Sequence, residues 1–139
     1  DSIVRGTTSK EIIVMAREAG ASKVYFASCS PAIRYPNVYG IDMPSFTELV
    51  AHGRTEEEVS DLLGADAVVY LDLPSLVESC KLAAPSHVQN FECSVFDGVY
   101  VTGDVSKEYF ERTEAMRTIK QNGSDVELVG LFNHFVNSH

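Results

Sequence analysis

The sequence predicts an α/β fold, and two observations support this prediction. Two short stretches rich in β-forming residues, at 23–28 and 67–71, have the length and composition of strands. Stretches with helical spacing, several with recognisable start and stop signals, alternate with them along the chain. Strands that alternate with helices are typical of a parallel sheet covered by helices.

The first helix is expected to begin with a capping box formed by Thr8 and Glu11 and to end at Ala19. Apolar residues at helical spacing predict its core face, made of Ile12, Met15, Ala16 and Ala19. After the first strand, residues 30–44 contain three prolines, which predicts a long ordered loop. Such a loop leaves the carboxyl end of a strand, where open α/β sheets bind their ligands.

The middle of the chain predicts helices with clear boundaries. Ser45 is expected to cap a short helix that ends at Gly53. Thr55 and Glu58 form a second capping box, which starts the helix that leads to the second strand. Pro74 is expected to start another helix after that strand, because proline suits the first helical turn.

The last part of the chain predicts a hairpin followed by helices. Residues 93–102 are expected to form a β-hairpin that turns on Asp97-Gly98, a strong two-residue hairpin signal. Residues 106–121 have a helical pattern of alternating charges, and residues 125–139 are expected to form a further helix.

The composition of the 139-residue chain limits its partners and location. A net charge of −9 argues against nucleic-acid binding, which requires clustered lysine and arginine. No apolar run approaches 18 residues, so nothing predicts a membrane segment. The chain has three widely spaced cysteines, Cys29, Cys80 and Cys93, which indicates free thiols in a reducing compartment. We therefore expect a cytoplasmic protein.

The most informative segment is the loop at residues 1–9, which runs straight into the first helix. Backbone N–H groups of a tight turn and of a helix N-terminus point at one spot, where the helix dipole favours an anion. Hydroxyl side chains and one arginine add donors, and a carboxylate adds an acceptor for sugar hydroxyls or a hard cation. The candidate binding residues are Asp1, Ser2, Arg5, Gly6, Thr7, Thr8 and Ser9.

The sequence of this loop resembles the phosphoribosyl pyrophosphate (PRPP) loop of the glutamine PRPP amidotransferases. The resemblance rests on DSIVRGTTS at 1–9, on YPNVYGIDMPS at 35–45 with ELVAHGR at 48–54, and on FECSVFDGVYVT at 91–102. It covers roughly residues 1–105 and is weak beyond them. It implies the second half of a type I phosphoribosyltransferase domain, which is Rossmann-like, followed by a C-terminal helical extension at 106–139.

The resemblance also implies an activity. Members of the family transfer ammonia from glutamine to PRPP, giving 5-phosphoribosylamine, pyrophosphate and glutamate in purine synthesis. It implies that residues 5–9 hold the 5′-phosphate, and that Asp1 assists with the ribose hydroxyls and with Mg²⁺ carried by pyrophosphate. Homo-oligomers and feedback inhibition by purine nucleotides are further implications.

Several family features have no counterpart in these 139 residues. The cysteine nucleophile of the glutaminase domain is absent, because residue 1 is aspartate, and no residue is assigned as catalytic. One branch of the family carries an iron–sulfur cluster, but its ligand positions fall at Asn37, Glu92 and Val95, so no cluster is expected. We therefore expect a piece of a longer protein that has no turnover alone, with a strand and a second acidic residue before Asp1.

Two alternatives and one open assignment remain. The same loop would serve a PRPP-sensing regulatory protein that catalyses no reaction, or a phosphoribosyltransferase of the same fold that acts on a purine base. Asp42 is either a site residue beside the sheet edge or a turn-forming residue, and its surroundings in the sequence favour neither.

Overall fold

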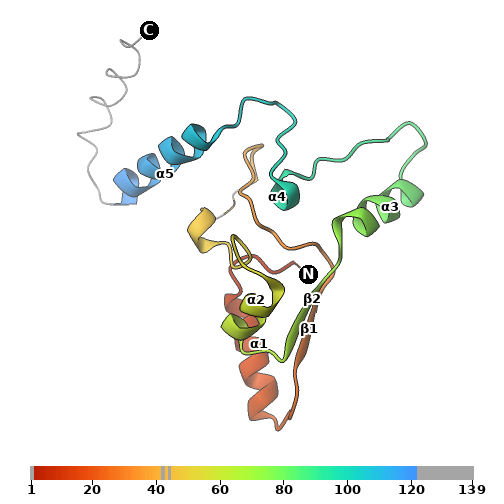
Figure 1. Cartoon of the computed structure of the whole chain (residues 1–139), viewed down its shortest axis with the longest axis vertical. Helices are drawn as coiled ribbons and strands as arrows, with labels where there is room; N and C mark the ends of the chain where they lie inside the picture. Colours follow the sequence, from red (N-terminus) through yellow and green to blue (C-terminus); the bar gives the residue numbers. More distant parts are fainter. Residues whose placement is uncertain (1, 42, 44, 122–139) are drawn as a thin grey trace. The chain divides into compact units, whose positions relative to one another are not determined.

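The computed structural model describes residues 2–41, 43 and 45–121. The chain divides into two compact units, Asp1–Val101 and Thr102–His139. Figure 1 shows the elements of each unit. In the described part of the chain, no helix combines the length and apolar character needed to span a bilayer.

The first unit is built on a parallel pair of strands, which confirms the α/β prediction. Strand β1 (Tyr25–Ser28) pairs with β2 (Ala67–Tyr70) in parallel, with Tyr25 opposite Ala67. The connection between the two strands contains the short 3₁₀ helix η1 (Phe46–Glu48) and helix α2 (Glu56–Leu63). Parallel neighbours require such a crossover, and here a helix provides it.

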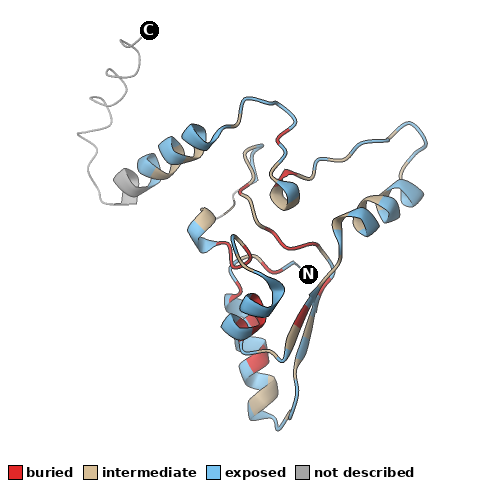
Figure 2. Ribbon diagram, in the orientation of Figure 1, coloured by how far each residue is buried: buried red, intermediate tan, exposed pale blue. Residues whose placement is uncertain are grey.

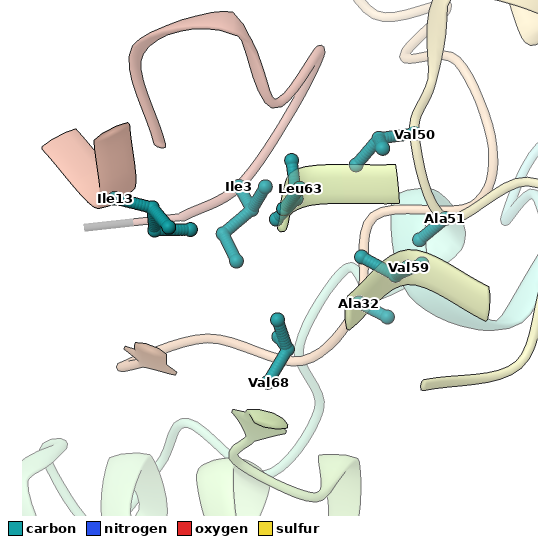
Figure 3. Packing of buried hydrophobic residues seen from close by; sticks show 8 residues of the cluster. All are labelled: Ile3, Ile13, Ala32, Val50, Ala51, Val59, Leu63 and Val68. Atoms are coloured by element: carbon teal, nitrogen blue, oxygen red, sulfur yellow. The ribbon is translucent and has the colours of Figure 1, made fainter. Parts of the chain in front are cut away.

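Helices α1 (Thr7–Glu18) and α2 pack together, and α2 packs on β2. Val68 of β2 is 3% exposed on the helix side, whereas Val69 is 54% exposed on the other face, as alternation along a strand requires. Many of the buried positions lie where the loop, α1, α2 and β2 meet, and others lie in the segment after β1 and near α4 (Figure 2). The core cluster consists of Ile3, Ile13, Ala32, Val50, Ala51, Val59, Leu63 and Val68 (Figure 3).

The boundaries of α2 follow the sequence prediction. The Thr55 hydroxyl accepts a hydrogen bond from the Glu58 N–H at 3.2 Å, and the Glu58 carboxylate accepts one from the Thr55 N–H at 2.8 Å. This reciprocal capping box satisfies two donors that a helix start leaves unpaired. The helix ends at Gly64, which adopts a left-handed conformation.

Helix α3 (Leu73–Ala83) also begins near the predicted position, with Pro74 in its first turn. Its N-cap is Asp72, whose carboxylate accepts a hydrogen bond from the Ser75 N–H at 2.9 Å. Hydrogen bonds from Ser75 lower the pKa of Asp72, because they stabilise the charged form.

The predicted hairpin at 93–102 is wrong. Residues Ser94–Asp97 form the short helix α4, and Gly98, with φ of 75°, ends it. Its N–H bonds to the Ser94 carbonyl at 2.8 Å, which closes a helical turn. A hairpin turn and a helix C-terminus both require a residue with positive φ, so Asp97-Gly98 signals either one.

The start and the core face of α1 also differ from the prediction. Its N-cap is Gly6, with no side-chain cap, so the capping box of Thr8 and Glu11 does not form. Among the helix's apolar residues, Ile13 is 1% exposed, whereas Ile12 and Met15 are 49% and 67% exposed. The face that packs in the core is therefore centred one position later than predicted.

In the second unit, helix α5 (Lys107–Gln121) confirms the helix predicted at 106–121. Lys107 and Glu111 form an ion pair one turn apart, with 3.4 Å between Nζ and Oε1. The helix predicted at 125–139 lies outside the described residues.

A partly exposed ion pair between Arg17 and Asp66 links the end of α1 to the residue before β2. Asp66 Oδ2 accepts hydrogen bonds from the Val24 N–H at 2.7 Å and from Arg17 Nη2 at 2.6 Å. The Val24 hydrogen bond, and after it the Arg17 guanidinium, hold the pKa of Asp66 below its ordinary value of 3.8. A lowered pKa means that Asp66 stabilises the fold when ionised.

We expect Asp66→Asn to make the thermal stability of the chain depend less on pH under acidic conditions. The contribution of Asp66 is present above its unfolded pKa of 3.8 and is lost as the pH falls through its lower folded pKa. Thermal unfolding between pH 6 and pH 2.5 would therefore show a shallower fall for the variant than for the parent chain. Asp61→Asn on α2 removes the same charge and is the control; equal slopes for all three proteins would contradict the assignment.

Candidate functional site

The candidate site is the loop at residues 2–9, which turns sharply at Gly6 into α1. Gly6 is buried and adopts φ of 79° and ψ of −2°, the left-handed region that side chains disfavour. Its carbonyl accepts the first hydrogen bond of the helix, from the Lys10 N–H at 2.9 Å. The loop therefore delivers the chain to the helix start through a conformation suited to glycine.

The residues just before α2 hold this loop in place. The Val50 N–H donates to the Val4 carbonyl at 2.9 Å, and Arg5 Nε donates to Glu48 Oε1 at 3.0 Å. Ile3, on the loop, is 2% exposed and packs in the core cluster with Leu63 (Figure 3). One end of the loop is thus anchored by packing and the middle by hydrogen bonds.

The start of α1 offers donors for an anion. Among the described residues, the N–H groups of Thr7, Thr8 and Ser9 have no hydrogen-bond acceptor, which is usual for the first turn of a helix. Thr7 and Thr8 are exposed, and their hydroxyls stand beside the positive end of the helix dipole. Arg5 supplies the permanent charge next to them. These groups can bind a phosphate.

Glu48 balances the charge of Arg5 from outside the loop. Its second oxygen, Oε2, accepts hydrogen bonds from the Ser45 N–H at 3.1 Å and the Ser45 hydroxyl at 3.2 Å. The Ser45 backbone hydrogen bond, followed by the hydrogen bond from Arg5, lowers the pKa of Glu48. Glu48 is therefore a carboxylate with both oxygens engaged.

The long loop after β1 is tied to α4 and the residues beyond it. The N–H groups of Arg34 and Tyr35 both donate to the Val95 carbonyl, at 2.9 and 3.1 Å. The Tyr100 hydroxyl donates to the Pro36 carbonyl at 2.7 Å, and burial raises the pKa of Tyr100 to about 12. The loop at 34–36 and the residues at 95–100, which are far apart in the sequence, are therefore joined by hydrogen bonds.

Comparisons with known proteins agree on one family. No protein-family model matches the chain. Over 117 residues, or 84% of this chain, it is 60% identical to an amidophosphoribosyltransferase of Pseudomonas aeruginosa and 57% identical to that of Escherichia coli. The chain is homologous to one segment of the amidophosphoribosyltransferases. It spans about 23% of the length of these relatives.

Two solved structures resemble this chain as well. A glutamine PRPP amidotransferase from B. subtilis, complexed with ADP and GMP, matches 72% of this chain and 22% of its own, with a TM-score of 0.60 and 36% identity. The allosteric regulatory enzyme of purine biosynthesis matches 73% of this chain, with a TM-score of 0.62.

The blocks that resemble amidophosphoribosyltransferases are joined by hydrogen bonds in the fold. The loop at 1–9 contacts the segment 48–54 through Val4–Val50 and Arg5–Glu48. The segment 35–45 contacts 91–102 through the bonds from Tyr35 and Tyr100 described above. The structure thus brings together most of the segments on which the resemblance rests, which sequence spacing alone could not establish.

Two residues considered for the site lie outside the described residues. They are Asp1, assigned to ribose hydroxyls and Mg²⁺, and Asp42, left between a site and a turn role. Within residues 2–41, 43 and 45–121, no three His, Cys, Asp or Glu side chains converge as a metal site would require. Magnesium carried by pyrophosphate needs only one or two protein carboxylates, so this finding is compatible with the assignment.

A groove runs from the loop along α1 and α2. It has a volume of about 680 Å³ and begins at Arg5, Gly6 and Thr7. Its far wall includes Met15 and Leu62, both well exposed. These are apolar residues of α1 and α2 that the core does not cover.

The residue that the sequence interpretation missed is Glu48. It lies 43 positions from Arg5 in the chain, and the two side chains meet only through the fold. Its position three residues after Ser45, which suggests a capping role, was the only available signal.

Proposed function

We propose that this chain forms the PRPP-binding part of an amidophosphoribosyltransferase, the enzyme that transfers glutamine-derived ammonia to PRPP. The observation that carries the proposal is the left-handed turn at Gly6, which opens α1 beside Arg5 and three hydroxyl residues. The identity of 57–60% to amidophosphoribosyltransferases over this segment supports it.

In this proposal, the 5′-phosphate of PRPP binds at the start of α1. The N–H groups of Thr7, Thr8 and Ser9 donate to its oxygens, and the Nη groups of Arg5 add charge-assisted hydrogen bonds. Asp1 assists with the ribose hydroxyls, and Ser2 belongs to the same binding loop. Bound Mg²⁺ would offset the charge that develops on the leaving pyrophosphate.

The net charge of −9 does not prevent an anionic ligand from binding. At physiological ionic strength, charges are screened over about 8 Å, so distant carboxylates contribute little at the loop. The local donors and the dipole of α1 act at contact distance, where screening is weak. The loop can therefore bind an anion although the chain as a whole is negatively charged.

Regulation and assembly belong to the same proposal. A purine nucleoside monophosphate contains ribose 5-phosphate, as PRPP does, so its phosphate fits the same loop. The B. subtilis amidotransferase is complexed with ADP and GMP, which supports feedback inhibition by purine nucleotides. We further propose a cytoplasmic homo-oligomer whose glutaminase domain, in the same whole protein, supplies ammonia.

The relatives favour this proposal over the two alternatives. The proteins compared above are amidophosphoribosyltransferases, rather than PRPP-sensing regulators or transferases specific for a purine base. A regulator would still bind PRPP, so the alternatives are separated by formation of 5-phosphoribosylamine by the whole protein.

Titration with PRPP and Mg²⁺ tests the site directly. We expect the backbone amide signals of Gly6 and Thr7 to shift in ¹⁵N NMR, while that of Gly53 stays in place. Arg5→Ala should weaken binding about tenfold, since it removes charge-assisted hydrogen bonds to phosphate. Ribose 5-phosphate should shift the same signals. No shift with millimolar PRPP would refute the proposed site.

A further inference from the structure

The contact between Arg5 and Glu48 has a geometry that leaves part of the guanidinium unused. Of the Arg5 donors, only Nε bonds to Glu48, at 3.0 Å from Oε1. Among the described residues, the two Nη groups of Arg5 have no acceptor. An arginine presents five N–H donors in a planar fork, so a side-on contact through Nε leaves the outer edge of the fork for a second anion.

The exposure of this ion pair argues against a role in stability. The side chains of Arg5 and Glu48 are 57% and 48% exposed. Ion pairs in such surroundings contribute little to folding, because water screens them and two long side chains lose freedom. What the contact does determine is where the Arg5 side chain points.

Glu48 is itself well placed to fix that direction. Its Oε2 is held by the N–H and the hydroxyl of Ser45, at 3.1 and 3.2 Å, so the carboxylate cannot rotate freely. Two residues further along, the Val50 N–H holds the Val4 carbonyl at 2.9 Å. One short segment, 45–50, therefore fixes both the backbone before Arg5 and its side chain.

We propose that Glu48 is a positioning residue for PRPP binding, which holds the Arg5 guanidinium ready for the 5′-phosphate. This inference rests on the proposed function, since it assumes that the loop binds PRPP. The contact fixes a long side chain before the ligand arrives, so that less freedom is lost on binding. Glu48 touches no ligand atom in this scheme and acts through Arg5.

Glu48 also brings a negative charge near the phosphate, and the repulsion between the two would weaken PRPP binding. If repulsion dominated, removing the charge would tighten binding. If positioning dominates, Glu48→Ala weakens PRPP binding by about threefold to tenfold, the usual cost of ordering one long side chain. Glu48→Gln, which keeps an oxygen for Arg5 Nε, then restores most of the affinity.

The test is calorimetric titration of the 139-residue chain with PRPP and Mg²⁺. We expect weaker binding for Glu48→Ala, near-parental binding for Glu48→Gln, and no change for Glu78→Ala, a matched control on exposed α3. In an Arg5→Ala background, Glu48→Ala should have no further effect, because the residue it positions is gone. Thermal unfolding of each variant checks that the fold is kept.

Each outcome has a distinct meaning. Unchanged or tighter binding by Glu48→Ala overturns the positioning role, and so does a further loss in the Arg5→Ala background, which would show that Glu48 acts on the loop without Arg5. Failure of the parent chain itself to bind PRPP would instead refute the proposed function.

Discussion

Replacement of Gly6 by alanine is expected to destabilise the first unit by about 3 kcal/mol and to abolish PRPP binding. A Cβ at this position would lie 2.7 Å from Leu63 Cδ2 and 3.3 Å from Val50 Cγ2, and both neighbours are buried. The left-handed backbone adds strain of about 1–2 kcal/mol for an L-residue, and overpacking a filled core adds about 1–3 kcal/mol. Relief of the backbone strain or of the overpacking would move the loop that carries the phosphate donors.

Chemical denaturation of Gly6→Ala and Gly53→Ala separates the two causes. Gly53 has φ of 66°, also left-handed, but no non-adjacent heavy atom of the described residues lies within 4 Å of the Cβ it would gain. Gly53→Ala should therefore cost only about 1 kcal/mol, from backbone strain alone. If the two variants lost equal stability, the close approach of the loop to Leu63 and Val50 would be of no energetic consequence.

The elements that were predictable from sequence are those whose signals are local. The Thr55–Glu58 capping box specifies its own geometry within four residues, and the structure confirms it. The strands at 25–28 and 67–70 follow from short runs of β-forming residues. Their parallel pairing follows from the helix between them.

The predictions that failed are those where one local signal suits two structures. Asp97-Gly98 fits both a hairpin and a helix end, and contacts elsewhere decide between them. In α1, Ile12 to Met15 are four consecutive apolar residues, so periodicity does not identify the buried face. Ile13 is the buried residue of this run because the loop and α2 bring Ile3 and Leu63 into the same core cluster.

Part of the candidate site could likewise be predicted from the sequence, and part could not. The donors of the loop at 5–9 are contiguous in sequence and could be recognised there. Glu48 could not, because its meeting with Arg5 depends on the path of the chain through β1 and the long loop after it. Side chains that support a site from distant segments leave no local pattern, even when their contacts are well formed.

Ser60→Ala is expected to destabilise the fold by about 2 kcal/mol, although it removes a single oxygen. The Ser60 hydroxyl donates to the Glu56 carbonyl and accepts from the Val68 N–H, both at 2.8 Å, and so links α2 to β2. Without it the Val68 N–H, in a residue only 3% exposed, is buried with no acceptor, which costs about 1–3 kcal/mol.

Ser79→Ala is the matched control for this change. Ser79 donates to the Ser75 carbonyl at 2.8 Å in the same helical geometry, but it is exposed on α3. Its loss should change stability by less than about 0.5 kcal/mol, since alanine favours the helix and water can replace the hydroxyl. Hydrogen exchange at the Val68 amide should accelerate in Ser60→Ala alone. Equal stabilities for the two variants would mean that water reaches Val68, and that the contact between α2 and β2 is looser than the hydrogen bonds through Ser60 indicate.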